Sequence, residues 1–196
     1  MSSNKRRRKK VTPGRILLKM IAIVLVFVLV VAFGGRAILN WRYPLKYTDI
    51  VEKYSTRYDV DENLIYAVIK TESGFDNYAV SEVGARGLMQ MTEETFDWIR
   101  TKIGGTETFD DLYQPEVSIH YGTYLLNYLL DEFDGDVDTA MSAYHAGSAS
   151  VRSWLKNPAN SEDGRRLNHI PKADTEHYVN KINRAIGIYE RRTAAE

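Results

Sequence analysis

One apolar run near the N-terminus constrains this 196-residue chain more than any other feature. Residues 16–35 contain one charged side chain, Lys19, and the stretch from Met20 to Phe33 contains no polar side chain. Helical residues rise 1.5 Å each, so this run spans about 30 Å, the thickness of the hydrocarbon core of a bilayer. It has no polar stripe, which is atypical of a helix in a soluble protein. The sequence therefore predicts a transmembrane anchor over residues 16–35.

The side chains before the anchor predict its orientation. Residues 1–15 contain seven Lys and Arg and no acid, and such clusters stay on the cytoplasmic side. We therefore expect a basic cytoplasmic tail at 1–15 and a single-pass protein of the cell membrane, with its body outside the cytoplasm. A cleaved signal peptide is the alternative, since Ala32-Phe33-Gly34 is small at both ends. Leu17 and Leu18 lengthen the span and favour a retained anchor.

The rest of the chain has a different charge. The total of 26 basic and 26 acidic residues conceals a net charge of −9 over residues 37–196. An acidic domain repels phosphates, so a nucleic-acid partner is excluded. The chain has no cysteine, which excludes a disulfide framework, a thiol nucleophile and zinc sites built on sulfur.

After a linker at residues 36–46, which contains Trp41, Tyr43 and Pro44, we expect one mostly α-helical domain over residues 47–196. Apolar side chains recur at helical spacing, and no clear run alternates with period two. The polar segment 157–168 is expected to be a surface loop. Helices are predicted at Tyr47–Tyr58, from Asp61 to a stop at Gly74, from Thr92 to Gly104, from Pro115 onward, at Asp138–Tyr144, at Ser150–Leu155, and from an N-cap at Asp174 or Thr175.

Glu72 is the acidic residue that stands out. Helical spacing from Ile65, Val68 and Ile69 places its carboxyl on the apolar face of its helix, in the last turn. Removal from water and the negative end of the helix dipole both disfavour the ionised form, so its pKa should be raised. A carboxyl group that keeps its proton near neutral pH suits a general acid in glycosidic-bond cleavage. The alternative is a solvated glutamate at a helix end.

Four short stretches carry a family resemblance. They are Glu72-Ser73-Gly74-Phe75, Ser81 to Gln90 (Ser-Glu-Val-Gly-Ala-Arg-Gly-Leu-Met-Gln), Ala143-Tyr144-His145-Ala146-Gly147 and Tyr178-Val179. In this order and spacing they resemble the lytic transglycosylase domain related to goose-type lysozyme. The resemblance covers roughly residues 47–190, and each stretch alone is weak.

The resemblance implies a small lysozyme-like helical fold and an enzyme that cleaves peptidoglycan glycan strands. The bond cleaved would be the β-1,4 bond between N-acetylmuramic acid and N-acetylglucosamine, without water, leaving a 1,6-anhydromuramyl end. Glu72 would act as general acid and then as base, and the hydroxyl of Tyr178 or the N-acetyl group would stabilise the cationic transition state. The remaining substrate-binding residues implied are Ser81, Met89, Gln90, Tyr144 and His145. No cofactor or metal is implied, and no protein partner is identified.

Two residues depart from the family pattern. His145 stands where the family usually has asparagine, so a group that titrates near pH 6.5 replaces a neutral amide. Asp174 stands where a glutamate often lies, four residues before Tyr178, and either takes part in the site or serves as an N-cap.

Other readings of the same residues remain open. A muramidase of the same fold would admit water, and Asp76 and Glu82 are the candidates for a second carboxylate. A glycan-binding or scaffold protein of the cell envelope would need no catalytic residue. Neither the acidic run from Asp131 to Asp138 nor the histidines at 120, 169 and 177 have metal-ligand spacing.

Overall fold

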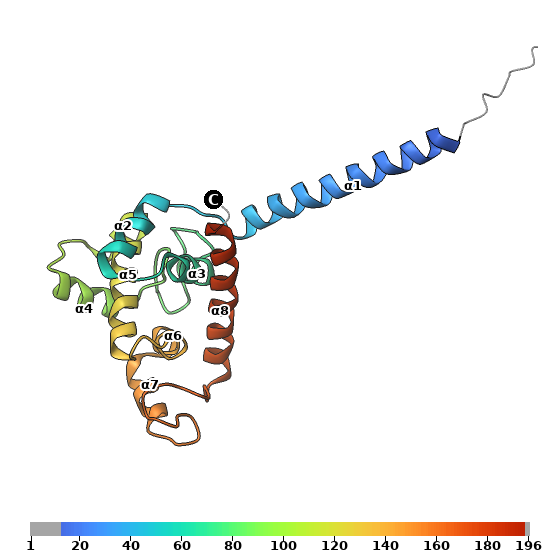
Figure 1. The fold of residues 1–196 in the computed structure, drawn as a ribbon. Helices are drawn as coiled ribbons and strands as arrows, with labels where there is room; N and C mark the ends of the chain where they lie inside the picture. The colour runs from blue at the N-terminus through green and yellow to red at the C-terminus, as the bar shows by residue number, and fades with distance from the viewer. Residues whose placement is uncertain (1–12, 195–196) are drawn as a thin grey trace, which may run out of the picture. The chain divides into compact units, whose positions relative to one another are not determined.

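The computed structural model describes residues 13–194, and the chain divides into two compact units, Met1–Pro44 and Leu45–Glu196 (Figure 1). Most of the basic tail predicted at 1–15 lies outside the described residues.

The first unit is a single long helix, α1 (Pro13–Arg42). Its segment Met20–Arg42, 23 residues, is long and apolar enough to cross a membrane, and the protein buries none of its apolar surface. The helix continues through residues 36–42, which were expected to belong to the linker. Ala37, Ile38 and Leu39 favour a helix, whereas Pro44 disfavours helical backbone at the residue before it.

The second unit is mostly helical, as predicted, and residues 45–194 contain no regular strand. A short 3₁₀ helix, η1 (Phe109–Tyr113), was not predicted. The α-helices are α2 (Thr48–Tyr58), α3 (Glu62–Glu72), α4 (Glu93–Ile103), α5 (Pro115–Glu132), α6 (Val137–Ala146), α7 (Ser148–Leu155) and α8 (Ala173–Thr193).

Helix α3 lies at the centre of this unit. The six residues Leu64–Ile69 are all buried, so the middle of this helix is covered on every side. Helix α8 packs along α3 and reaches α6, and α5 packs against α2 and α6 (Figure 1). The packing of α3 against α8 brings the end of α3 close to the first turns of α8.

Most of the predicted helix ends are confirmed. The side chain of Asp61 accepts from the backbone of Asn63 at the start of α3, and Thr92 caps α4. Pro115 is the first residue of α5, where its missing N–H is not needed.

The predicted start of the last helix is wrong. Helix α8 begins at Ala173, its N-cap residue is Lys172, and no side chain caps it. Asp174 lies in the first turn instead, where its negative charge still complements the helix dipole.

Candidate active site

Glu72 is the last residue of α3, and its side chain is partly buried. Burial raises the pKa of Glu72 from its ordinary value of 4.5 to about 7, and a hydrogen bond from Tyr178 opposes that rise. Desolvation therefore dominates, because it penalises the ionised form more than one hydrogen bond stabilises it. Near neutral pH the carboxyl is available both as an acid and as a base.

Tyr178 holds one oxygen of that carboxyl. Its hydroxyl donates to Oε1 of Glu72 over 2.6 Å, across 106 residues of sequence. Tyr178 is 7% exposed on α8. Burial, and then the charge of Glu72, raise the pKa of Tyr178 well above 10, so it stays protonated and can donate.

Tyr144 lies near the same carboxyl from the side of α6. Its hydroxyl donates to the carbonyl oxygen of Met89 over 2.7 Å. Burial raises the pKa of Tyr144 well above 10, and the charge of Glu72 adds to the effect. The C-terminal end of α6 and the loop before α4 are thereby tied together beside Glu72.

His145 follows Tyr144 and covers Tyr178. The two rings stack with centroids 4.7 Å apart and planes inclined by 28°. Nδ1 of His145 lies 3.1 Å from Oγ1 of Thr175, a fully buried residue of α8. Partial burial lowers the pKa of His145 below 6.5, more than Asp174 raises it, so the ring is neutral at pH 7.

The segment 73–92, between α3 and α4, is held in a strained but well-bonded conformation. The hydroxyl of Ser73 donates to the carbonyl of Leu88 over 2.9 Å. Phe75 and Gln90 both have left-handed backbones, with φ of 72° and 47°, which is costly for side chains of their size. A Cβ on Gly87 would come within 2.2 Å of the carbonyl oxygen of Leu112. Such strain is often found at functional sites.

Ser81 and Gln90 make hydrogen bonds within this segment. Oγ of Ser81 accepts from the backbone N–H of Ala85 over 3.0 Å. Nε2 of Gln90 donates to the carbonyls of Ala79 and Gly87, both over 3.0 Å. Both hydrogen bonds from the side-chain nitrogen of Gln90 are therefore made within the segment. The side-chain oxygen is the group of Gln90 that can accept from a ligand.

Met89 is placed in the core. Its side chain is fully buried, and its sulfur and methyl group occupy the space that a Cβ on Gly122 of α5 would need. The family resemblance implied that Met89 binds substrate, but its side chain is buried in the core and is not exposed for such a contact. Met89 contributes its carbonyl oxygen, which accepts from Tyr144.

Asp174 does not meet Glu72. It is exposed, it pairs with Lys172 over 3.1 Å, and it accepts from the backbone N–H of Thr175 over 2.8 Å. The pKa of Asp174 is lowered, chiefly by its hydrogen bond with the side chain of Lys172, so its carboxylate is ionised.

The structure thus brings together Glu72, Tyr144, His145 and Tyr178, with Gln90 and Ser81 in the adjoining segment. Sequence reasoning missed Ser73 and Thr175. Ser73 follows Glu72 directly, which was the available signal. The sequence carries no signal for Thr175, because a threonine in the first turn of a helix is usually solvated.

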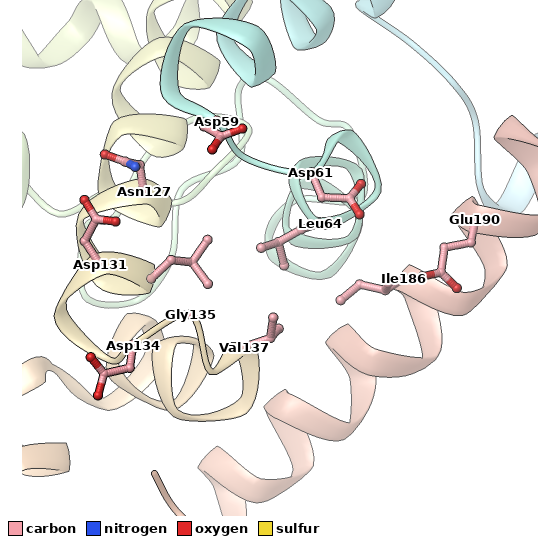
Figure 2. A pocket seen from close by; sticks show the side chains of 11 residues that line it. Asp59, Asp61, Leu64, Asn127, Asp131, Asp134, Gly135, Val137, Ile186 and Glu190 are labelled. Atoms are coloured by element: carbon pink, nitrogen blue, oxygen red, sulfur yellow. The ribbon is translucent and has the colours of Figure 1, made fainter. Parts of the chain in front are cut away.

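A separate cavity lies at the opposite end of α3. It has a volume of about 550 Å³ and is bordered by Asp61, which caps the start of that helix, whereas Glu72 ends it. Figure 2 shows carboxylates around an apolar floor that includes Leu64 and Ile186. Asp131 and Asp134 of the acidic run line it, and within residues 13–194 no three acidic, histidine or cysteine side chains are grouped to hold a metal ion.

Comparison with known proteins identifies similar chains. The profile of the family described as "Transglycosylase SLT domain" matches residues 49–166, more than half of the chain. The soluble lytic murein transglycosylase of Escherichia coli (strain K12) is 31% identical over 147 residues, 74% of this chain and 23% of that protein. The membrane-bound lytic murein transglycosylase C of Edwardsiella ictaluri is 32% identical and covers 74% of this chain and 47% of that protein.

Two solved structures of lytic transglycosylases are also similar to this chain. The 70 kDa soluble lytic transglycosylase of Escherichia coli superposes with a TM-score of 0.72 at 28% identity over 79% of this chain and 26% of that one. The lytic transglycosylase Slt of Pseudomonas aeruginosa superposes with a TM-score of 0.71 at 28% identity, over 80% of this chain and 26% of that one. The chain therefore spans about a quarter of the length of the Escherichia coli and Pseudomonas aeruginosa proteins, and the predicted lysozyme-like helical fold is confirmed for the second unit.

Proposed function

The chain belongs to the transglycosylase SLT domain family, and from that premise we propose that it is a membrane-anchored lytic transglycosylase. Its substrate is the β-1,4 bond between N-acetylmuramic acid and N-acetylglucosamine in peptidoglycan, and its product carries a 1,6-anhydromuramyl end. One observation carries the proposal. The carboxyl of Glu72 is partly buried, has a pKa of about 7, and accepts a hydrogen bond from the hydroxyl of Tyr178.

In the proposed reaction Glu72 serves twice. Its proton passes to the glycosidic oxygen of N-acetylglucosamine as the bond from that oxygen to C1 of the muramyl ring breaks. The carboxylate then takes the proton of the C6 hydroxyl, whose oxygen bonds to C1. No water is consumed, and Glu72 ends protonated as it began. A pKa near the working pH suits both steps.

The neighbours of Glu72 have distinct proposed roles. Tyr178 donates to the carboxylate and keeps the pKa of Glu72 from rising further. Tyr144 lies at the end of α6 near this carboxyl, His145 lies against the Tyr178 ring, and both are proposed to present ring surface to a sugar. Ser81 and the amide oxygen of Gln90 contact the acetamido group or the peptide-bearing sugar.

A mechanism with one carboxyl fits the surroundings better than a hydrolase with two. In the described residues, burial and Tyr178 account for the pKa of Glu72, and no second carboxylate contributes. Asp76 and Glu82 are both exposed, and Asp76 accepts from the backbone of Tyr78. Glycosidases normally use two carboxyl groups that flank the bond.

The proposed location is the outer side of the cytoplasmic membrane, with the basic N-terminus inside. Helix α1 supports an anchor by its length and composition, and one relative is a membrane-bound murein transglycosylase. The positive residues before the helix favour this orientation.

Mass analysis of products tests the proposal. The full chain in detergent should release muropeptides from intact peptidoglycan that are lighter by one water than those of a muramidase. Glu72→Gln should lower the rate about 100- to 10,000-fold, the usual contribution of a general acid and base. Hydrated products would support a muramidase. Release of no products, with glycan bound equally by both proteins, would support a scaffold.

A further inference from the structure

Five side chains form a continuous series of contacts that ends at the proposed catalytic carboxyl. Asp174 lies 3.4 Å from the hydroxyl of Thr175, which lies 3.1 Å from Nδ1 of His145. The ring of His145 stacks on Tyr178, whose hydroxyl donates to Glu72 over 2.6 Å. Asp174 and His145, the two departures from the family pattern, are therefore linked through one buried threonine.

The direction of each hydrogen bond follows from the charges. The carboxylate of Asp174 is ionised and can only accept. The hydroxyl of Thr175 therefore donates to Asp174, and its oxygen accepts from Nδ1–H of the neutral imidazole. This fixes the tautomer and the plane of the His145 ring. The charged groups that act on His145 are Asp174 and Lys172, both exposed at the start of α8.

The plane of His145 matters because of what the ring covers. His145 itself is exposed, whereas Tyr178 beneath it is 7% exposed. A ring held in a fixed plane restricts the Tyr178 ring from one face, and the hydroxyl of Tyr178 lowers the pKa of Glu72 against the larger effect of burial.

We propose that His145 and Asp174 act as a coupled pair of positioning residues, which through Thr175 and Tyr178 hold the Tyr178 hydroxyl on the carboxyl of Glu72. The proposal rests on the function proposed above and extends it, since neither residue needs to touch the substrate to act in this way.

A double-mutant cycle on the full chain in detergent tests the coupling. His145→Phe keeps a stacked ring and loses the hydrogen bond to Thr175, and Asp174→Asn removes the charge that orients Thr175. Each change alone should lower kcat about threefold, the range of one net hydrogen bond, with KM unchanged. In the His145→Phe background, Asp174→Asn should have no further effect.

A second readout follows the carboxyl itself and requires no turnover. Each single change should weaken the hydrogen bond from the Tyr178 hydroxyl to Glu72. Because that hydrogen bond lowers the pKa of Glu72, the NMR titration midpoint of Glu72 should move upward. Glu176→Gln and His177→Asn are the matched controls, because both residues are exposed on the first turns of α8. They should leave kcat and the titration unchanged.

Additive effects of the two changes, a change in KM alone, or an unmoved titration of Glu72 would overturn the positioning proposal. Unfolding temperatures of all variants show whether a loss comes from misfolding. Failure of the proposed function is distinguishable, because it would appear as the absence of anhydro products from the unmodified chain.

Discussion

Two opposing effects determine the chemistry of Glu72 at the scale of single residues. Burial pushes its pKa upward and the Tyr178 hydroxyl pulls it downward, with a balance at about 7. Spacing alone placed Glu72 on the apolar face of its helix, which was enough to predict a raised pKa. It was not enough to predict the bonding role of Tyr178, because that bond joins residues on different helices, 106 positions apart.

Tyr178→Phe should reveal this balance. Loss of the donor removes the one interaction that lowers the pKa of Glu72, so that pKa should rise above about 7. The protonated acid then persists to higher pH, and the basic limb of the profile of kcat/KM against pH should move upward. The rate itself should fall about tenfold, since a hydrogen bond to a charged group is lost.

The control for that experiment is Tyr144→Phe, which removes a hydroxyl bonded to the carbonyl of Met89 rather than to Glu72. It should leave the basic limb where it is, whatever its effect on rate. An equal shift in both variants would mean that Tyr178 has no special influence on Glu72.

At the scale of elements, local signals predicted the helices and missed the contacts between them. Asp61, Thr92 and Pro115 marked helix starts because capping and a missing N–H act within one turn. The start of α8 has no such capping signal, because its N-cap residue is Lys172 and no side chain caps the helix. The burial of Met89 was also missed, because it depends on a glycine 33 positions away on α5.

Gly122→Ala tests the packing of α5 against Met89. A Cβ at this position would lie 2.2 Å from the sulfur of Met89, so overpacking should destabilise the unit by about 1–3 kcal/mol. Gly187→Ala on α8 is the matched control, because its nearest contact is 3.7 Å away. It should stabilise the helix by about 0.5–1 kcal/mol, as alanine does in place of glycine. Equal shifts in unfolding temperature would mean that Met89 does not occupy the space over Gly122.

At the scale of the whole molecule, the chain combines an apolar helix, α1, with a second, mostly helical unit. The sequence predicted the anchor from length and composition, the same two properties that make Met20–Arg42 a candidate membrane span. Residues 36–42 were expected in a linker, whereas they are helical, because their aromatic and apolar side chains are equally compatible with a linker and with the end of a helix.

The absence of cysteine makes topology directly measurable. Val83 is 81% exposed in the second unit, so Val83→Cys should react with a membrane-impermeant maleimide in right-side-out vesicles. In the proposed orientation Ser3→Cys should react only after the membrane is permeabilised, because clusters of basic residues stay on the cytoplasmic side. Labelling of Ser3→Cys from outside would reverse the orientation, and a mature chain that lacks it would show a cleaved signal peptide.

In the proposed mechanism burial keeps a proton on the carboxyl of Glu72 near neutral pH, and direct titration of Glu72 tests this. The ¹³C carboxyl resonance of Glu72, assigned by its loss in Glu72→Gln, should titrate with a midpoint of about 7 in the full chain in detergent. A midpoint near the ordinary value of 4.5 would contradict the account, because Glu72 would then be ionised at neutral pH and could not supply the first proton.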